Sequence, residues 1–402
     1  MPRFAPALVA AVALATAGGA APAANDQCQV GWWPQPRQSA CSSSSAVDSA
    51  APSPDTVRTL RLVWEYDSKG SVSAPVVDGG VVYVQTTDAD RRPRLRALAL
   101  DSGNQIWEVY GGRGDSPPVV HGDILLRLSS GWLLRRYGLR RGDLAWRRPV
   151  AAPSTEGWTG IPLIADHNWY LSTGESIVAY GERTGRFRWT RPAYCSRCVI
   201  AASGGRVYAG GARAVVALAA RTGTTAWATR VTAGSTPGSV ILAAGRVFTA
   251  TSGRSKGRYT FAVEAFSADT GRRLWRASVG TAPYDQIGAT PAATASLVVF
   301  PSPDGNVYAL DARTGALRWR QAFGLSDSAP ALVHGLVWLA STPLGSNRPA
   351  SLVALDLASG RPLSTTPLHE SVETATDPSP VVAGGTVLFS TSHRILAFRA
   401  AG

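Results

Sequence analysis

One short pattern recurs along the chain and constrains its fold more than any other feature. An alanine is followed six residues later by a glycine and four residues after that by a tryptophan, as in Ala97, Gly103 and Trp107. Successive glycines are 38 to 48 residues apart. Because one four-stranded propeller blade takes about 40 to 45 residues, this period predicts a β-propeller. The glycine stands at Gly103, Gly142, Gly185, Gly223, Gly271, Gly315 and Gly360, and the tryptophan at Trp64, Trp107, Trp146, Trp189, Trp227, Trp275 and Trp319.

A second repeated element precedes the copies of this pattern. It consists of a proline-led apolar strand, a glycine turn and another apolar strand, as in residues 75–84 and 118–126. Eight such units occur, and no long stretch shows helical periodicity. The sequence therefore predicts an all-β chain of eight four-stranded antiparallel blades.

The two ends of the repeat region suggest how the ring closes. Residues 395–398 form the third strand of the eighth unit, and the sequence then ends at Gly402 without an outer strand. Residues 60–66 form an isolated outer strand that carries Trp64. Pairing this N-terminal strand with the C-terminal blade leaves no open sheet edge at the seam. We therefore expect an eight-bladed propeller over residues 58–402.

The repeated residues have structural interpretations. The glycine suits a turn that needs positive φ between the third and fourth strands. The tryptophan on the outer strand is expected to cover the next blade, burying on the order of 150–250 Å² per ring. Two copies are degenerate, because Arg136 replaces the alanine in blade 2 and Ser364 replaces the tryptophan in blade 7.

The full pattern, an alanine, a Ser-Gly or Thr-Gly pair and a tryptophan, resembles the tryptophan-docking motif of the PQQ-type quinoprotein propellers. Residues 309–319 match it most fully and keep the family's aspartate as Asp311. The resemblance covers nearly the whole chain after its N-terminal segment. It implies either a dehydrogenase that binds pyrroloquinoline quinone and calcium, or a cofactor-free member such as the assembly lipoprotein of the outer-membrane β-barrel machinery.

Two features place the chain in the cofactor-free branch. The enzymes of the family typically carry an adjacent pair of cysteines over the quinone, and this chain has no adjacent cysteines. They also carry longer insertions between blades with the calcium ligands, for which this sequence has little room. No cofactor is therefore expected, and PQQ with calcium belongs only to the alternative.

The N-terminal residues predict a secretory signal. Arg3 precedes an apolar run and then small residues that end at Ala23 and Ala24, which together are typical of a cleavable signal peptide over residues 1–24. The mature chain is expected to lie outside the cytoplasm, secreted or periplasmic, with no membrane span. Residues 25–57 form an irregular arm whose Ser-, Ala- and Pro-rich part, 42–56, is either a flexible linker or an arm on the propeller surface.

Four cysteines in a secreted chain suggest disulfides. Three pairings are possible, and the local one joins Cys28 to Cys41 and Cys195 to Cys198. A redox role for the C-x-x-C sequence at 195–198 is disfavoured, because its flanks are strands and not the start of a helix.

Positive charge is concentrated in blade 2. The formal net charge is +13, and this blade contains seven arginines and two aspartates, Asp123 and Asp143. Such a patch would attract anionic wall or surface polymers before nucleic acid, although a solvated face is the plainer interpretation. The patch consists of Arg127, Arg135, Arg136, Arg140, Arg141, Arg147 and Arg148.

No catalytic or metal-binding cluster stands out in the sequence. The five histidines are scattered singly. The RGD string at 113–115 overlaps the segment that normally leads into the first strand of a blade, so the repeat itself explains it. Inter-blade segments are where a propeller binds ligands, and their acidic and aromatic residues are the candidates for a ligand site. These candidates are Glu156, Trp158, Asp285, Glu370, Glu373 and Asp377.

Three hypotheses for function follow. The favoured one is a secreted, monomeric, non-catalytic propeller that acts as a binding or scaffolding module for an unknown protein or cell-envelope component. The first alternative is a PQQ-dependent dehydrogenase, and the second is an arginine-rich binder of anionic surface polymers.

Overall fold

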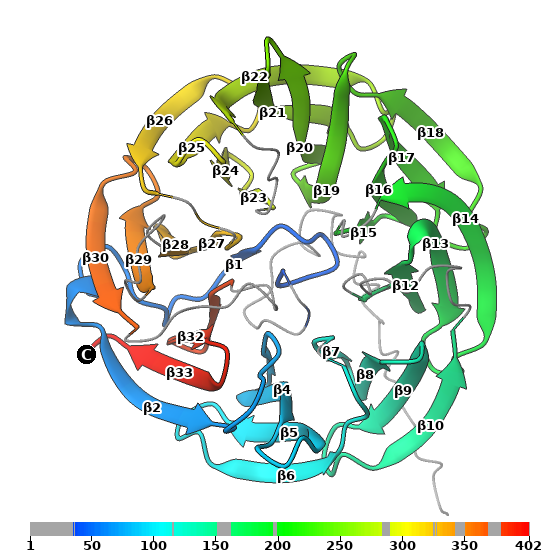
Figure 1. Cartoon of the computed structure of the whole chain (residues 1–402), viewed down its shortest axis with the longest axis vertical. Helices are drawn as coiled ribbons and strands as arrows, with labels where there is room; N and C mark the ends of the chain where they lie inside the picture. Colours follow the sequence, from blue (N-terminus) through cyan, green and yellow to red (C-terminus); the bar gives the residue numbers. More distant parts are fainter. Residues whose placement is uncertain are drawn as a thin grey trace, which may run out of the picture.

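The computed structural model of the chain consists of a ring of β-sheets (Figure 1). It describes residues 35, 37–114, 116–150, 162–195, 199–283, 290–324, 326, 328–341, 350–368 and 379–401. Eight sheets each contribute four strands to the ring, and one sheet has a fifth strand, β1. The prediction of an eight-bladed propeller of four-stranded antiparallel blades is confirmed.

Blades 1 to 4 follow one another along the chain, each running from the centre of the ring to its rim. Their strands are β3 (Val76–Asp78), β4 (Val81–Thr87), β5 (Pro93–Ala99) and β6 (Gln105–Tyr110); β7 (Val119–His121), β8 (Ile124–Ser129), β9 (Leu133–Gly138) and β10 (Leu144–Pro149); β11 (Leu163–Ala165), β12 (Asn168–Ser172), β13 (Gly174–Gly181) and β14 (Phe187–Cys195); β15 (Ala201–Ser203), β16 (Arg206–Gly211), β17 (Ala214–Ala219) and β18 (Thr225–Arg230).

Blades 5 to 8 complete the ring, and β1 joins the inner edge of blade 7. Their strands are β19 (Ser235–Ala243), β20 (Arg246–Ser255), β21 (Arg258–Ser267) and β22 (Arg273–Ala282); β23 (Ala292–Ala293), β24 (Leu297–Pro301), β25 (Asn306–Asp311) and β26 (Leu317–Ala322); β1 (Ser45–Ala46), β27 (Ala331–Val333), β28 (Leu336–Ser341), β29 (Ser351–Asp356) and β30 (Pro362–Pro367); β31 (Val381–Ala383), β32 (Thr386–Ser390), β33 (Arg394–Arg399) and β2 (Arg61–Asp67). A 3-10 helix, η2 (Val57–Thr59), precedes β2.

The N-terminal strand closes the ring. Strand β2 pairs antiparallel with β33 and becomes the outer strand of blade 8, beside the C-terminal end of the chain (Figure 1). Trp64 lies opposite Ala397, just as Trp107 lies opposite Ala97 in blade 1. The isolated strand is therefore the missing fourth strand of the last blade, as expected.

Seven junctions between blades repeat one contact. Trp189 shows its form: the indole Nε1 donates to the carbonyl of Ala220 at 2.9 Å, and its ring lies against Gly223 of the next blade. A Cβ at Gly223 would lie 2.5 Å from that ring, and its φ is +68°, so glycine is required on both counts. The same contact joins Trp64 to Gly103, Trp107 to Gly142, Trp146 to Gly185, Trp227 to Gly271, Trp275 to Gly315 and Trp319 to Gly360.

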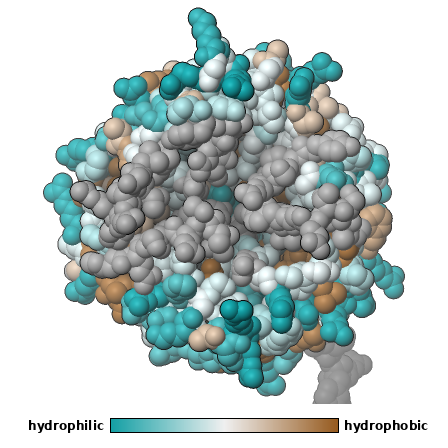
Figure 2. Space-filling model, viewed as in Figure 1, coloured by the Kyte–Doolittle hydropathy of each residue, from teal (hydrophilic) through white to brown (hydrophobic). Residues whose placement is uncertain are grey.

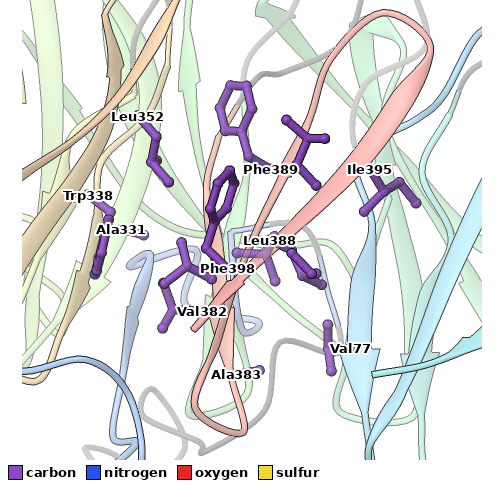
Figure 3. Packing of buried hydrophobic residues seen from close by; sticks show 14 of the residues in the cluster. Val77, Ala331, Trp338, Leu352, Val382, Ala383, Leu388, Phe389, Ile395 and Phe398 are labelled. Atoms are coloured by element: carbon purple, nitrogen blue, oxygen red, sulfur yellow. The ribbon is translucent and has the colours of Figure 1, made fainter. Parts of the chain in front are cut away.

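The hydrophobic core lies between neighbouring sheets. One cluster spans blades 7, 8 and 1 (Figure 3). In it, Phe389 and Phe398 of blade 8 lie between Trp338 of blade 7 and Val77 of blade 1. Within this cluster, blade 8 buries both faces of its sheet against its two neighbours.

The rim of the ring is polar with scattered apolar side chains (Figure 2). The exposed apolar residues of the outer strands include Leu62, Ile106, Leu144, Phe187 and Leu317. Within the described parts of the chain, no helix is long and apolar enough to cross a membrane.

Candidate functional site

The N-terminal arm lies inside the ring, across the inner ends of the blades (Figure 1). Its backbone carbonyls accept hydrogen bonds from the innermost strands of successive blades. Ala40 accepts from Ala202 of blade 4 at 2.7 Å, and Cys41 accepts from Leu242 of blade 5 at 2.9 Å. The arm therefore moves from one blade to the next as it crosses the channel.

The same path continues into blades 6 and 7. Ser43 accepts from Ala293 of β23 at 2.9 Å, and Ser44 accepts from Leu332 of β27 at 2.8 Å. After Ser44, strand β1 pairs in parallel with β27. The innermost strand of a propeller blade has a free edge, and the arm satisfies part of that edge in four consecutive blades.

Blade 3 is held by a side chain. The amide of Gln35 donates through Nε2 to the carbonyl of Ile164 at 3.1 Å and accepts from the Ile164 N–H at 2.9 Å. This bidentate contact imitates a strand pair with β11. The described arm thus contacts every inner strand from blade 3 to blade 7.

Small side chains allow the arm to fit. Four consecutive serines, 42–45, are each at most 2% exposed, and the hydroxyl of Ser42 donates to the carbonyl of Ile200 at 2.9 Å. Ser42 and Ser44 have φ of +51° and +50°, a left-handed conformation that non-glycine residues rarely adopt. This conformation persists where surrounding contacts enforce it. Residues 42–46 are therefore part of the packed interior and not a flexible linker, whereas Val47, Ser49 and Ala50 are exposed, so the rest of the segment continues as an arm on the propeller surface.

The arm leaves the channel over the turns that join the first and second strands of blades 7 and 8, which we call the inner turns. Asp48 accepts hydrogen bonds from the N–H groups of Ala50 and Gly385, both at 3.0 Å. His334, in the turn between β27 and β28, donates from Nδ1 to the carbonyl of Ala51 at 2.8 Å. Residues 48–54 are therefore fixed to the inner turns of these two blades.

On the other side of the ring, the corresponding turns of blades 2 and 3 bring together titratable side chains. Glu182 is buried, its Oε1 is hydrogen-bonded to His121 Nδ1, and its Oε2 lies 3.7 Å from His167 Nδ1. The hydrogen bond that His121 donates to the Glu182 carboxylate raises the pKa of His121. Burial raises the pKa of Asp78, in the equivalent turn of blade 1. In the sequence these histidines are isolated, and only the fold brings them together.

The predicted arginine patch is not one surface, which corrects the expectation. Arg127 and Arg135 are buried. Arg127 donates from Nη1 to the carbonyls of Gly111 and Gly112, at 2.5 and 3.1 Å. Arg135 lies over the ring of Tyr110, 5.5 Å from its centroid. These two arginines hold the junction between blades 1 and 2 and cannot meet a polymer.

Exposed arginines instead lie along the outer edges of blades 2 and 3, in β10 and β14 and in the turns that precede these two strands. Trp146 donates to the carbonyl of Arg183 at 2.9 Å, and Arg148 reaches the turn at Gly185, so the two outer edges adjoin. Arg136 is half-buried, 3.8 Å from Asp123. We call the exposed set, which forms no ion pair with a carboxylate of the described chain, the arginine flank: Arg140, Arg141, Arg147, Arg148, Arg186 and Arg188.

Several sequence-based candidates fall outside the described residues. Cys28, Cys198 and part of the RGD string do so, as do all six candidates in the inter-blade segments: Glu156, Trp158, Asp285, Glu370, Glu373 and Asp377. Cys41 is buried and disulfide-bonded, and the pairing of the four cysteines stays a prediction.

The described residues do not fit a calcium–quinone site. They hold no group of three or more His, Cys, Asp or Glu side chains placed to bind a metal ion. The arm, moreover, fills the inner side of blades 3 to 7, where a ligand in the channel would contact the strands. We therefore derive no chemical step through a quinone.

Comparison with known proteins agrees with this architecture. A family profile described as outer membrane protein assembly factor BamB matches residues 58–208, 173–344 and 259–402. The crystal structure of BamB from Moraxella catarrhalis is 14% identical, with a TM-score of 0.62 over 85% of this chain and 97% of that protein. A quinohemoprotein alcohol dehydrogenase from Comamonas testosteroni is 13% identical, with a TM-score of 0.64 over 92% and 81% of the two chains.

One curated relative adds a different context. The serine/threonine-protein kinase AfsK of Streptomyces coelicolor is 28% identical over 246 residues, which are 57% of this chain and 28% of the kinase. The match thus spans little more than a quarter of the kinase. The three profile matches together extend from residue 58 to residue 402 and cover most of the sequence. The chain belongs to the BamB-like family of PQQ-type repeat propellers.

Proposed function

We propose that this protein is a non-catalytic binding or scaffolding propeller that works outside the cytoplasm, at the cell envelope. The observation that carries the proposal is the arm in the channel. Backbone bonds from Ala40, Cys41, Ser43 and Ser44 occupy the inner edges of four blades. Because the chain itself occupies these inner edges, partners are expected to bind at the rim or the faces of the ring.

The chemistry of the described side chains supports the same proposal. Glu182 accepts a hydrogen bond from His121 and lies near His167, and no serine or cysteine side chain of the described chain is hydrogen-bonded to these three side chains. A site for nucleophilic catalysis by a side chain needs a nucleophile, a base and an oxyanion donor at one point. A binding role needs only a rigid surface, which eight packed blades supply.

The first experiment separates binding from dehydrogenase activity. PQQ and calcium are added to the purified mature chain, and alcohol-dependent dye reduction and the melting temperature are measured. We expect no dye reduction and no thermal shift. A quinone that did bind would be detected, because a ligand at 100 times its Kd stabilises a protein by about 2.7 kcal/mol. Quinone-dependent oxidation of an alcohol would overturn the proposal.

Mass spectrometry of the secreted chain tests the signal peptide. The mature chain is expected to start at Ala24 or Asn25.

A second candidate function rests on the arginine flank, which could bind an anionic surface polymer. Like charges at one rim attract a polyanion, and salt weakens this attraction. The test measures binding to polyglutamate at increasing salt for the intact chain and for a variant with Arg140, Arg141, Arg186 and Arg188 changed to Gln. The variant should bind at least tenfold more weakly at low salt.

The matched control removes the same charge elsewhere. It changes four exposed arginines of blades 4 and 5 to Gln: Arg213, Arg221, Arg230 and Arg272. If both variants lose affinity equally, net charge alone explains the binding and the flank has no special role. Affinity that does not change with salt excludes this candidate function.

A further inference from the structure

The hairpin of β20 and β21 in blade 5 extends beyond the hairpins of the neighbouring blades. Its ladder has ten residue pairs and ends where Ser255 lies opposite Arg258. The equivalent ladders have six pairs in blade 4 and five in blade 6. At about 3.3 Å per residue, the additional pairs carry the hairpin about 13 Å past that of blade 4. Its end reaches beyond the outer strands at the top of Figure 1.

A tight turn ends this hairpin. Lys256 and Gly257 have φ of +49° and +78°, and positive φ at both central residues is the mark of the two-residue type I′ turn, which suits a twisted hairpin. Residues 254–258, which we call the hairpin tip, are all exposed. The top of Figure 2 shows a hydrophilic projection at this place. The hairpin tip is therefore a convex projection that continues an unbroken strand pair.

The hairpin tip carries three positive charges and no negative one. Arg254, Lys256 and Arg258 form no ion pair with a carboxylate of the described chain. The sequence contains no Asp or Glu between Glu182 and Glu264, and Glu264 is fully buried. The charge of the hairpin tip is therefore not neutralised by the chain itself.

The three cations lie on both sides of the hairpin and at its turn. Arg258 lies opposite Ser255, and such a pair shares one side of the two strands. Arg254 lies opposite Tyr259 on the other side, and its guanidinium is over the tyrosine ring, 5.6 Å from the centroid. Arg258 donates from Nη2 to a carbonyl of β22 at 3.5 Å. Both arginines are thus held by neutral groups, and Lys256 stands between them at the turn.

We propose that the hairpin tip binds end-on to the anionic headgroups of a phospholipid membrane. A protein partner that packs on a hairpin contacts mainly one of its sides, whereas a headgroup layer surrounds a tip that enters it, and the cations here lie on both sides. Each Lys or Arg near an anionic membrane surface strengthens binding about fivefold, so three together should strengthen it about a hundredfold. Tyrosine is common at the depth of the headgroups, which suits Tyr259. The inference does not depend on the scaffolding function, since the hairpin tip contacts a membrane whether or not the ring holds a partner.

The test measures co-sedimentation of the full mature chain with vesicles. Vesicles of phosphatidylcholine mixed with phosphatidylglycerol present anionic headgroups, and vesicles of phosphatidylcholine alone are neutral. We expect binding to the anionic vesicles only, and weaker binding as salt is added, because ions screen exposed charges. Binding of soluble polyglutamate to the same proteins distinguishes an acidic protein segment from a membrane.

Two triple variants assign the binding to the hairpin tip. The first combines Arg254→Gln, Arg258→Gln and Lys256→Asn, since asparagine tolerates the positive φ of the turn. It should bind anionic vesicles at least tenfold more weakly, with an unchanged melting temperature, because all three side chains are exposed. The matched control removes the same charge from exposed turns at the other end of blades 4, 5 and 6, and it should bind nearly as well as the intact chain. Its changes are Arg221→Gln, Arg272→Gln and Arg313→Gln.

Three outcomes would overturn the proposal. Equal loss of affinity in the two triple variants would mean that net charge, and not the hairpin tip, attracts the membrane. Equal binding to neutral and anionic vesicles would remove the role of the three cations. Failure to bind anionic vesicles at low salt would exclude a membrane contact, and if polyglutamate then binds through the hairpin tip, the partner is an acidic protein segment instead.

Discussion

The junction between blades 4 and 5 and the junction between blades 7 and 8 hold neighbouring sheets together with different residues. At the first, Trp227 lies against Gly271 and donates to the Ala268 carbonyl at 2.9 Å. At the second, Ser364 stands at the tryptophan position, and no turn joins β33 to β2, since these strands come from opposite ends of the sequence.

The second junction is completed by segments from outside the repeat. Val57 of η2 is fully buried there, and Leu363 of β30 packs against the same cluster. Across the inner turns, the bonds from His334 to Ala51 and from Gly385 to Asp48 join residues 283 and 337 positions apart. The comparison indicates that a repeated local contact is replaced, at the seam, by contacts that only the N-terminal arm can supply.

Removal of the arm should have the largest effect. A chain that begins at Thr56 loses the backbone and Gln35 hydrogen bonds in the channel as well as the contacts of residues 48–54. At about 1 kcal/mol for each hydrogen bond, the free energy of unfolding should fall by about 5 kcal/mol or more, a large part of the 5–15 kcal/mol typical of a folded domain. Urea denaturation measures it.

A shorter truncation separates the two roles of the arm. A chain that begins at Val47 loses the channel contacts and keeps Asp48 and Ala51 at the seam, so it should be more stable than the chain that begins at Thr56. If both truncated chains unfold at the urea concentration of the intact protein, the arm does not stabilise the ring.

Substitution of a tryptophan that docks one blade on the next should have the second-largest effect on stability. Trp189→Ala removes a ring that is 5% exposed and should lower the free energy of unfolding by about 3–5 kcal/mol, as for other buried aromatic truncations. Ser364→Ala, at the same blade position in blade 7, should change it by less than about 0.5 kcal/mol. Guanidinium denaturation compares the two variants. Equal losses would mean that blade 7 is docked through Ser364 after all.

The ring and its closure could be predicted from the sequence because both depend on local patterns. A glycine that must have positive φ and a tryptophan four residues later are recognisable in six of the seven copies, and Trp64 marks the missing strand. The buried arginines could also have been anticipated in part. Arg135 and Arg136 are neighbours in β9, and successive side chains of a strand point to opposite faces, so they could not share one surface.

The position of the arm could not be predicted in this way. Its serines and alanines have the composition of a flexible linker, and its bonds to the inner strands use backbone carbonyls, which leave no side-chain signal. Similarly, His121 and Glu182 are 61 residues apart, and only the ring brings the turns of blades 2 and 3 together. The one available signal was position, since His121 and Asp78 end equivalent strands of neighbouring blades.

A pair of glycine substitutions in blade 4 should have a smaller, separable effect. Gly223→Ala places a Cβ 2.5 Å from the Trp189 ring in a backbone with φ of +68°, whereas Gly204→Ala has φ of +60° and nothing within 4 Å. The left-handed backbone costs alanine about 1–2 kcal/mol at both sites. Only Gly223→Ala should cost more than this in thermal unfolding. Equal costs would mean that the tryptophan shifts freely and that the close approach is not a constraint.

The smallest effect concerns the inner turns of blades 1 to 3, where His121 is paired with a carboxylate, whereas His334 of blade 7 is bonded to a neutral carbonyl. Glu182, Arg183 and Asp78 act on His121, and the hydrogen bond to Glu182 raises the pKa of His121 above its unfolded value of about 6.5. The stabilisation is therefore complete below pH 6.5 and is lost as the pH rises through the folded-state pKa. Because His121 is half exposed, water screens the pair, and the contribution should be only about 0.5 kcal/mol. His121→Gln should reduce the difference in unfolding free energy between pH 5.5 and pH 8.5. An unchanged pH dependence in His121→Gln would show that Glu182 does not hold the proton at this histidine.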